Sequence, residues 1–302
     1  MQSQAVGLAV VGCAGDNDDY LQAADRLRRG SLAQDVFDTI DDALAKSDTF
    51  DAAIVRTPLD GRGDAVCRLA EAGKHVLVDA PIAASATGAE EAVAVAAENG
   101  VALMVGRTLR FLPGNQTILS RLAEKKLGAP GLLRVHRWSS AGGAGDSVPE
   151  LLVGDVDLAI QIFGDLPARI YALQREPAYL QIHFGFEGGG MAVLDFARGL
   201  PEGRGYDSLH VIGATGAAYA DDHHNTHLVY RGGDPTTRIS GHGNYHVARE
   251  VQEFVDAIIE SRTPLVNGEE GCKALRVIAA VCASIDSGQP LRRNDGSYEV
   301  SQ

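Results

Sequence analysis

The sequence predicts a two-domain protein: an α/β domain with a shortened Rossmann-like parallel sheet, followed by an α+β domain with a large, mostly antiparallel open sheet. The chain of 302 residues is long enough for two hydrophobic cores. In residues 1–113, short apolar runs alternate with helical patterns, which is typical of a parallel sheet covered by helices. In residues 114–302, alternating segments separated by glycine-rich turns indicate antiparallel strands with one covered face.

The first domain begins with an apolar run over residues 5–11, as expected for a strand buried on both faces. We then expect a helix over 18–29, a strand over 52–55, a helix ending at Gly73, a strand over 75–78, a helix beginning at Ser85 or Thr87, and a strand over 101–105. Glu90 stands three residues after Thr87, which is the spacing of a capping box at a helix start.

The second domain begins with two helices, near 114–126 and 149–163, that flank a strand over 132–138. Further strands are expected over 168–174, 179–186, 190–196, 208–213 and 227–231. Two amphipathic helices end the chain. One places Val247, Val251, Phe254, Val255 and Ile258 on one side, and the other places Leu275, Ile278, Cys282 and Ile285 together.

The composition excludes several classes of protein. A net charge of −13 argues against nucleic-acid binding, which needs a basic surface. No segment approaches the roughly 20 apolar residues of a membrane span. The four cysteines show no Cys-x-x-Cys spacing, so we expect reduced thiols and a cytoplasmic protein.

Two segments carry a family signature. Residues 75–81 read His-Val-Leu-Val-Asp-Ala-Pro, and residues 152–164 read Leu-Val-Gly-Asp-Val-Asp-Leu-Ala-Ile-Gln-Ile-Phe-Gly. They resemble two landmarks of the glucose–fructose oxidoreductase/inositol dehydrogenase (Gfo/Idh/MocA) family of NAD(P)-dependent sugar oxidoreductases. In that family the first landmark ends Glu-Lys-Pro, and the second reads Gly-x-His-x-x-Asp. Other correspondences are the Thr57-Pro58 turn, Arg110-Phe111-x-Pro113 and Gly213-Ala214-Thr215-Gly216.

The resemblance also shows what this chain lacks. In the family a lysine and a histidine move the proton of the substrate hydroxyl, and here those positions hold Ala80 and Gly154. Neither side chain can accept or donate a proton, so oxidation through that pair is excluded unless other groups take over. Asp157 stands at the family's aspartate position, as a substrate-hydroxyl acceptor or base, or as a helix-end carboxylate. Asp79 stands at the family's glutamate position. It lies at the carboxyl end of a predicted strand, where open α/β sheets bind ligands, so it either contacts a ligand or shapes the turn before Pro81.

The glycine fingerprint of a dinucleotide fold is incomplete. Gly12 and Gly15 remain as candidate cofactor-binding residues, but Ala14 and Asn17 stand where two further glycines would let the pyrophosphate approach. The resemblance implies NAD(P), with Thr57-Pro58 beside it. The residues themselves favour a Rossmann-like sheet that binds no dinucleotide.

An acid at the end of the second strand should hold the adenine ribose. The sequence shows no clear second strand: after the first helix the chain passes almost directly to Asp35-Val36-Phe37, so a strand–helix unit is predicted to be missing. Asp35 or Asp38 could take the role of the acid, and nothing in the sequence selects between them.

Three arginines follow predicted strands that should end at one crevice: Arg56, Arg107 and Arg110. The planar fork of arginine suits a carboxylate or phosphate, so these residues predict an anionic substrate pocket. The alternative is that they pair with Asp79, Asp157 or surface acids.

Two groups of histidines remain. His223, His224 and His227 with two neighbouring aspartates resemble a metal cluster, but their place in a predicted hairpin favours solvated turn residues, and we expect no metal. His136 and Trp138 lie on the same side of a predicted strand. The face on which they lie belongs to the core, to a subunit interface or to the wall of a pocket.

We therefore expect a family member without ordinary NAD(P)-dependent sugar dehydrogenase activity, acting as a non-redox or ligand-binding relative on a sugar-like or anionic small molecule. The alternative is an atypical NAD(P)-dependent oxidoreductase on a sugar or cyclitol derivative. The resemblance also implies a homo-oligomer, a dimer or tetramer formed through the large sheet.

Overall fold

The computed structural model describes residues 6–12, 20, 31–140, 147–175, 179–200, 206–221, 226–230, 236–239 and 245–301. Contacts divide the chain into two units. Unit 1 comprises Met1–Phe111 and Gly243–Leu275, and unit 2 comprises Leu112–His242 and Arg276–Gln302. This division differs from the sequence-based boundary at residue 113 because residues 243–275 contact the first unit.

Unit 1 is built on a parallel sheet of five strands in the order β2-β1-β3-β4-β5. The strands are β1 (Val6–Val11), β2 (Ser31–Phe37), β3 (Ala52–Val55), β4 (His75–Val78) and β5 (Leu103–Val105). Every residue of β3 is buried, as expected where helices cover both faces of a parallel sheet. This confirms the predicted Rossmann-like fold of the first domain.

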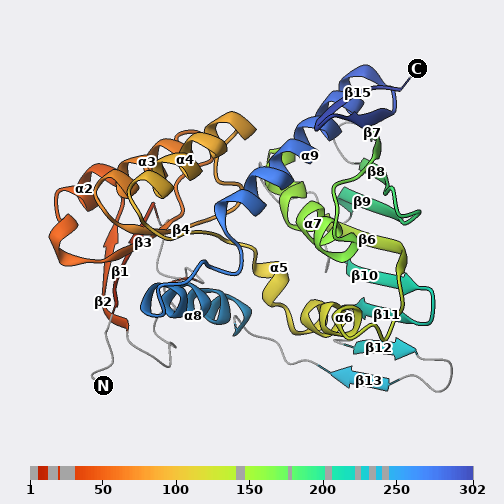
Figure 1. Ribbon diagram of the computed structural model, residues 1–302, viewed down its shortest axis with the longest axis horizontal. Coiled ribbons are helices and arrows are strands. Elements are labelled where there is room, and N and C mark those ends of the chain that lie inside the picture. The colour runs from red at the N-terminus through yellow and green to blue at the C-terminus, as the bar shows by residue number, and fades with distance from the viewer. Residues whose placement is uncertain are drawn as a thin grey trace. The chain divides into compact units, whose positions relative to one another are not determined.

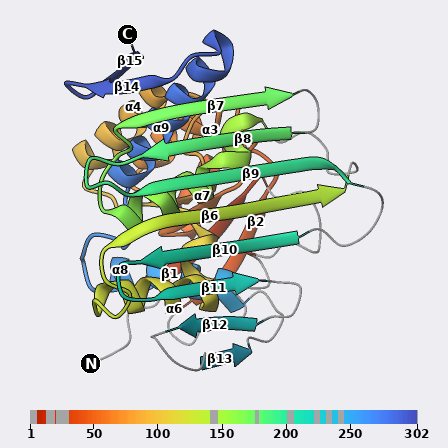
Figure 2. The same ribbon diagram turned by 90° about the vertical axis from the view of Figure 1, so that its right-hand side faces the viewer.

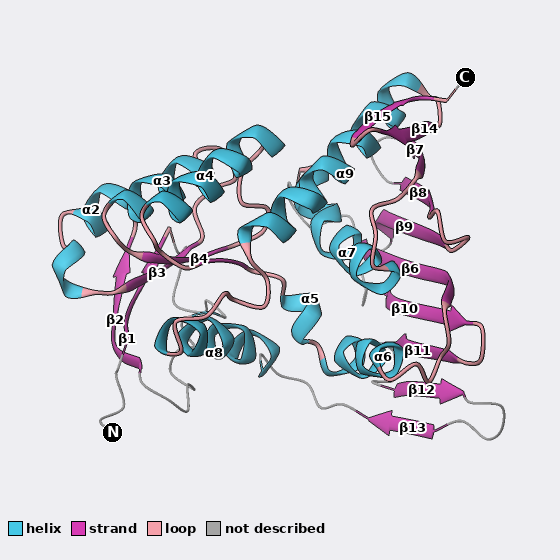
Figure 3. Cartoon of the chain, in the orientation of Figure 1, coloured by secondary structure: helices cyan, strands magenta, loops and turns pink. Residues whose placement is uncertain are grey.

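Helices cover both faces of this sheet. They are α2 (Ile40–Leu44), α3 (Arg62–Glu71), α4 (Ala86–Glu98), α5 (Thr108–Phe111), α8 (Tyr245–Ile259) and the start of α9 (Gly268–Ser287), with a short 3-10 turn, η1, at Ser47–Thr49. Figure 1 and Figure 3 show α2, α3 and α4 on one side of the strands and α8 on the other. The predicted apolar side of α8 is buried, with Val251 and Phe254 fully enclosed.

Helix α4 begins one residue after Ser85. The Ser85 Oγ accepts a hydrogen bond from Gly88 N–H at 3.1 Å, which caps the first turn. Thr87 already lies inside the helix, so the capping box proposed for Thr87 and Glu90 is wrong. Ser85 was the other of the two starts that the sequence left open.

The segment in which the sequence showed no strand is β2. It pairs in parallel with β1 and is the outer strand of the described sheet, so only one of its sides is covered by a neighbouring strand. Val36 on this strand remains 48% exposed. An outer strand needs no continuous apolar run, which is why the pattern was missed. The second strand is therefore present beside β1, and α2 follows it before β3, so the prediction that a strand–helix unit is missing is wrong.

Unit 2 is built on a ten-stranded sheet in the order β13-β12-β11-β10-β6-β9-β8-β7-β14-β15. Its central strands are β6 (Pro130–Ser140), β7 (Arg169–Arg175), β8 (Tyr179–Gly185), β9 (Met191–Leu200) and β10 (Tyr206–Gly213). Its outer strands are β11 (Ala217–Asp221), β12 (Thr226–Tyr230), β13 (Thr236–Ile239), β14 (Leu291–Asn294) and β15 (Ser297–Val300). The described pairs are antiparallel except β6 with β9, which confirms the mostly antiparallel sheet.

Helices α6 (Pro113–Ala123) and α7 (Val148–Phe163) lie against one face of this sheet, together with the part of α9 from Arg276 on. Figure 2 shows the strands in front of them, with the other face of the sheet toward the viewer. Helix α7 begins with a capping box formed by Ser147 and Glu150. At its end Phe163 stacks on Phe186 with ring centroids 4.0 Å apart, and a Cβ at Gly190 would lie 2.2 Å from the Phe163 ring.

Within the described residues, no helix has the length and apolar character that crossing a bilayer would require.

Candidate functional site

The strand order of unit 1 identifies where a ligand should bind. In open α/β sheets the crevice lies outside the carboxyl ends of the strands, at the point where the order reverses. Here the chain places β2 on one side of β1 and β3 on the other. The residues that follow these three strands are Gly12, Asp38 and Arg56-Thr57-Pro58. We call this side of the sheet the carboxyl edge.

Gly12 closes the carboxyl edge tightly. Its N–H donates to Phe37 O at 2.9 Å, and Arg56 N–H donates to Val11 O at 2.9 Å, which ties the ends of the three strands together. Gly12 has a φ of 79°, and a Cβ there would lie 2.8 Å from both the backbone nitrogen and the Cγ2 of Thr57. Only glycine meets both demands. Gly15, the second predicted glycine, lies outside the described residues.

The structure separates the two candidate ribose acids. Asp35 lies inside β2, and its Oδ2 accepts a hydrogen bond from the Thr49 hydroxyl at 2.8 Å. Asp38 directly follows the last residue of β2 and is exposed. Because Gly12 is hydrogen-bonded to Phe37, Asp38 stands next to the turn after β1. Of the two acids, Asp38 has the position that ribose recognition requires.

Thr57 adds an unused polar group to the same edge. Its Oγ1 is buried and makes no hydrogen bond to any described residue. A buried hydroxyl without a partner is unusual, since most buried polar groups are hydrogen-bonded. Thr57 is therefore a candidate to hydrogen-bond a ligand, and Pro58 beside it is exposed.

Arg56 and Asp79 form an ion pair at the carboxyl edge. Arg56 Nε lies 3.6 Å from Asp79 Oδ2, and the two side chains are 30% and 32% exposed. The Arg56 guanidinium lies over the ring of Tyr20, 5.1 Å from its centroid. Asp79 Oδ1 also accepts the Ala80 N–H at 3.0 Å, so Asp79 shapes the turn after β4 as well as pairing with Arg56.

A buried acid that no sequence pattern indicated contacts Tyr20. Glu250 of α8 is fully buried, and its Oε2 accepts a hydrogen bond from the Tyr20 hydroxyl at 2.8 Å. Its Oε1 accepts the backbone N–H of Arg107, whose side chain is itself buried. The missed signal was an acid inside an apolar helix stripe, since Glu250 stands between Val247 and Val251.

Burial dominates the titration of this cluster. It raises the pKa of Glu250 to about 8, although hydrogen bonds from Tyr20 and Arg107 act in the opposite direction and Asp79 adds to the rise. Burial and the nearby Glu250 also raise the pKa of the Tyr20 hydroxyl well above its usual value. Ionisable groups with strongly shifted pKa values are typical of functional sites.

The three predicted arginines do not converge on one point. The Arg56 guanidinium lies over Tyr20, whereas the printed contact of Arg107 with Glu250 is made by its backbone N–H. Arg110 is 6% exposed and lies 3.2 Å from Glu270 Oε2. Burial raises the pKa of Glu270, but hydrogen bonds from Lys273 and Arg110 lower it below its usual value overall. An anionic pocket built from all three arginines stays a prediction.

The residues at the positions of the catalytic pair lie in different units. Ala80 directly follows Asp79 at the carboxyl edge of unit 1 and is half-buried. Gly154 and Asp157 lie on α7 of unit 2. Asp157 is 2% exposed and lies well inside this 16-residue helix, so the interpretation as a helix-end carboxylate is wrong.

The predicted histidine groups have different outcomes. His223 and His224, and the side chain of His227, lie outside what the structure describes. No group of three metal-ligating side chains occurs in the described part of the chain. His136 is half-buried on β6, where its Nδ1 lies 2.7 Å from Asp195 Oδ1.

The side chains of Trp138 and Asp195 line a groove of about 680 Å³ over β6 to β9. Trp138 donates its Nε1–H to Asp195 Oδ2 at 2.8 Å, which makes Asp195 the shared partner of His136 and Trp138. His136 lies in register with Asp195 of β9 and with Ser208 of β10. This cluster belongs to unit 2 alone.

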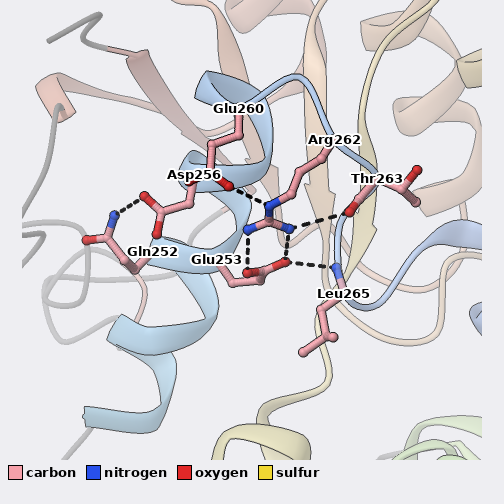
Figure 4. A network of polar contacts seen from close by, with 7 residues as sticks. All are labelled: Gln252, Glu253, Asp256, Glu260, Arg262, Thr263 and Leu265. Atoms are coloured by element: carbon pink, nitrogen blue, oxygen red, sulfur yellow. Dashed lines mark hydrogen bonds and ion pairs between the residues drawn. The ribbon is translucent and has the colours of Figure 1, made fainter.

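A second groove lies in unit 1, at the edge of the parallel sheet opposite the carboxyl edge, which we call the amino edge. It has a volume of about 650 Å³, and His75, Gly100 and Arg262 are among its lining residues. Figure 4 shows how the adjoining connection between α8 and α9 is held: Arg262 donates two hydrogen bonds to Glu253, at 2.7 and 2.8 Å, and one to Glu260 at 2.7 Å. Glu253 also accepts Leu265 N–H at 2.9 Å.

Comparisons with known proteins agree with this geometry. Residues 7–107 match an oxidoreductase family with an NAD-binding Rossmann fold (GFO_IDH_MocA), and residues 190–292 match the C-terminal alpha/beta domain of the same family. The chain is 26% identical over 266 residues to the uncharacterized oxidoreductase YrbE of Bacillus subtilis, which covers 80% of this chain and 77% of that protein. It is 22% identical over 269 residues to the inositol 2-dehydrogenase of Rhizobium meliloti, covering 81% of each.

A crystal structure shares the fold. It is an oxidoreductase from Agrobacterium radiobacter in complex with NAD+, L-tartaric acid and magnesium. The TM-score is 0.83 at 16% identity, over 95% of this chain and 98% of that chain.

Proposed function

We propose, because the chain belongs to the Gfo/Idh/MocA oxidoreductase family, that it binds NAD(H) at its carboxyl edge and a sugar-like or anionic small molecule without ordinary sugar dehydrogenation. The observation that carries the proposal is Ala80, which stands directly after Asp79 at that edge and bears no proton-transferring group. The protein would therefore bind the dinucleotide and the small molecule without oxidising the small molecule.

The described residues of the carboxyl edge suit a dinucleotide. Gly12 leaves its turn free of a Cβ, and Thr57 Oγ1 has no partner among the described residues. Asp38 would accept hydrogen bonds from the adenine ribose. A carboxylate there favours NAD(H) over NADP(H), since the extra 2′-phosphate of NADP(H) is negative. When bound, the nicotinamide would supply a hydride acceptor or donor.

The missing pair limits what that nicotinamide can do. Dehydrogenation of a hydroxyl needs a base for the proton, which typically contributes about 10²–10⁴-fold in rate. Ala80 and Gly154 supply none. The relatives act on cyclitols by name, as in inositol 2-dehydrogenase, and this supports a sugar-like ligand. The arginines Arg56 and Arg107 support an anionic one.

The proposal extends to a homo-oligomer in the cytoplasm. Its support is the resemblance, together with exposed Leu173, Tyr179 and Met191, which the strand register places on one face of the unit 2 sheet. Large exposed apolar side chains on one sheet face are typical of a protein interface. Size-exclusion chromatography with light scattering tests this part.

The first test measures dinucleotide binding. NADH and NADPH are titrated by fluorescence and by thermal shift. A ligand present at 100 times its Kd should add about 2.7 kcal/mol of apparent stability. We expect NADH to stabilise the protein more than NADPH. No response to either would contradict the proposal.

The second test restores the lost chemistry. We expect no turnover of inositols or aldoses by the natural chain, and measurable turnover by the double variant Ala80→Lys with Gly154→His. The matched control, Ala80→Met with Gly154→Gln, adds similar volume without the proton-transfer pair. Turnover by the natural chain near the rate of the double variant would overturn the proposal.

A second candidate function is an atypical oxidoreductase on a sugar or cyclitol derivative. It is favoured by the Asp79 carboxylate, which is 32% exposed directly beside Ala80 and could accept a proton. Asp157 is the other inherited acid. If the natural chain turns over a polyol and Asp79→Asn abolishes this turnover while NADH still binds, this second function is the correct one.

A further inference from the structure

Arg62 is a buried arginine to which the sequence gave no role. It is the first residue of α3, and its side chain is 5% exposed. Its Nε donates a hydrogen bond to Thr57 O at 2.9 Å. Its Nη1 donates to Pro81 O at 3.1 Å and reaches Asp79 O at 3.4 Å. One side chain thus bonds to the turn after β3 and to the turn after β4.

Local physical chemistry disfavours an arginine at this position. The first turn of a helix carries partial positive charge, so a cation there is unfavourable. Burying a charge is costly unless hydrogen bonds compensate. Arg62 therefore goes against the residue preferences of a helix start and of a buried position, and such exceptions are expected at functional sites.

The surrounding packing is arranged to bring the second turn within reach. Helices α3 and α4 pack on one another over Ala83, which is buried. A Cβ at Gly63 would lie 3.0 Å from Ala83 Cβ, and a Cβ at Gly88 would lie 3.3 Å from it. Larger residues at either glycine would push residues 81–83 away from Arg62.

We propose that Arg62 is a positioning residue for dinucleotide binding. Its guanidinium holds the Thr57-Pro58 turn and the turn at residues 79–81 at a fixed separation, and so presents Thr57 Oγ1 and Asp79 to the crevice. This inference rests on the proposed function, because it assigns a support for the same edge.

The shape of the side chain fits this role. A planar guanidinium donates in several fixed directions, so it can bond to carbonyl oxygens of two separate chain segments at once. A lysine ammonium is a compact point charge on a flexible stem. Lysine at position 62 should therefore retain charge but hold the two turns less well.

The experiment compares five proteins: the natural chain, Arg62→Met, Arg62→Lys, and the two controls Arg68→Met and Gly100→Ala. Arg68 is the matched control, since it lies on the same helix but is exposed and pairs with Asp41. Two quantities are measured. Hydrogen–deuterium exchange reports the amides of residues 57–62 and 79–83 without ligand, and fluorescence titration gives the Kd for NADH.

For Arg62→Met we expect faster exchange in both segments and at least tenfold weaker NADH binding, which equals about 1.4 kcal/mol. Arg62→Lys should fall between Arg62→Met and the natural chain. Arg68→Met should match the natural chain in both quantities. Gly100→Ala, a strained change at the amino edge, controls for general destabilisation and should leave the Kd unchanged.

Unchanged exchange in both segments, or a Kd within about twofold of the natural value in folded Arg62→Met, would overturn the inference. If Arg62→Met does not fold, Arg62→Lys decides by the same two criteria. Failure of the proposed function looks different. In that case the natural chain itself binds no NADH, while exchange still reports whether Arg62 holds the turns.

Discussion

At the carboxyl edge of the unit 1 sheet, burial raises the pKa of Glu250 to about 8. At the amino edge, burial would raise the pKa of Glu253, but hydrogen bonds from Arg262 and Leu265 N–H lower it below its usual value. Both acids belong to α8 and differ by three positions. One edge therefore keeps an acid that is costly to ionise, and the other neutralises its acid with an arginine.

This difference distinguishes charged groups that stabilise the fold from charged groups that we assign to ligand binding. The Arg262 network fixes the connection between α8 and α9, so its charges are explained by folding alone. The carboxyl edge gathers Glu250, Asp79 and Thr57 Oγ1 without such full compensation. Costly groups that folding does not explain mark the edge where a ligand should bind.

The largest expected effect is a difference in the free energy of unfolding between alanine substitutions at two glycines with positive φ. Gly12 at the carboxyl edge has φ 79°, and Gly100 at the amino edge has φ 65° with no atom within 4 Å of a built Cβ. Gly100→Ala should cost about 1 kcal/mol from backbone strain alone. Gly12→Ala adds overpacking against Thr57 and should cost about 4 kcal/mol in total. Urea unfolding of both variants measures this, and equal losses would contradict the packing argument.

The second prediction concerns pH. Because the pKa of Glu250 is raised from 4.5 to about 8, the folded state keeps a proton that the unfolded state releases. Its contribution is fully present below pH 4.5 and is lost as pH rises toward 8, by about 4 kcal/mol across this window. Glu250→Gln should flatten that part of the stability profile measured by urea unfolding.

Glu253 provides the opposite sign as a control. Its lowered pKa means that its contribution is present above the unfolded value of 4.5 and is lost as the pH falls below it. Glu253→Gln should therefore change the acid side of the profile only. A Glu250→Gln profile that parallels the natural one between pH 5 and 8 would show that Glu250 does not hold its proton.

The third prediction tests the ribose acid. Asp38→Asn should weaken NADH binding about tenfold, or about 1.4 kcal/mol. It should also reduce the ratio by which the protein binds NADH more tightly than NADPH, because the negative charge that disfavours the 2′-phosphate of NADPH is removed. Asp35→Asn is the matched control, since Asp35 lies inside β2 and bonds to Thr49. The Kd values for NADH and NADPH are compared by titration. Equal effects of the two variants would remove the special role of Asp38.

The smallest effect is expected at the amino edge. Arg262 is 38% exposed, so Arg262→Met should lower the free energy of unfolding by about 1 kcal/mol or less. It should leave the Kd for NADH unchanged, because no residue of the Arg262 network belongs to the carboxyl edge. Chemical unfolding and titration give both values, and weaker NADH binding would show that the two edges are coupled.

The sequence predicted the buried strands well and the outer ones poorly. β3 and β4 were predicted with the bounds that the structure shows, because strands covered on both faces read as continuous apolar runs. β2, β11, β13, β14 and β15 were missed. β2 is an outer strand with polar residues, and β11 reads Ala-Ala-Tyr-Ala-Asp, which has little β-branched character.

The candidate site followed the same division. Gly12 and Thr57 could be found because they follow apolar strands directly. Glu250 and Tyr20 could not, since they are 230 residues apart and each resembles an ordinary helix residue. Only the packing of α8 against the parallel sheet within unit 1 brings them into hydrogen-bond contact.

The sequence by itself determined the family, the two kinds of sheet and the replacement of the proton-transfer pair by Ala80 and Gly154, because these depend on local patterns and residue identity. The tertiary structure decided that Asp38 rather than Asp35 follows the outer strand, that Glu250 is buried beside Tyr20, and that Arg62 joins two turns. These depend on which distant segments pack together. Burial and hydrogen bonding are properties of that packing, so no single stretch of sequence contains them.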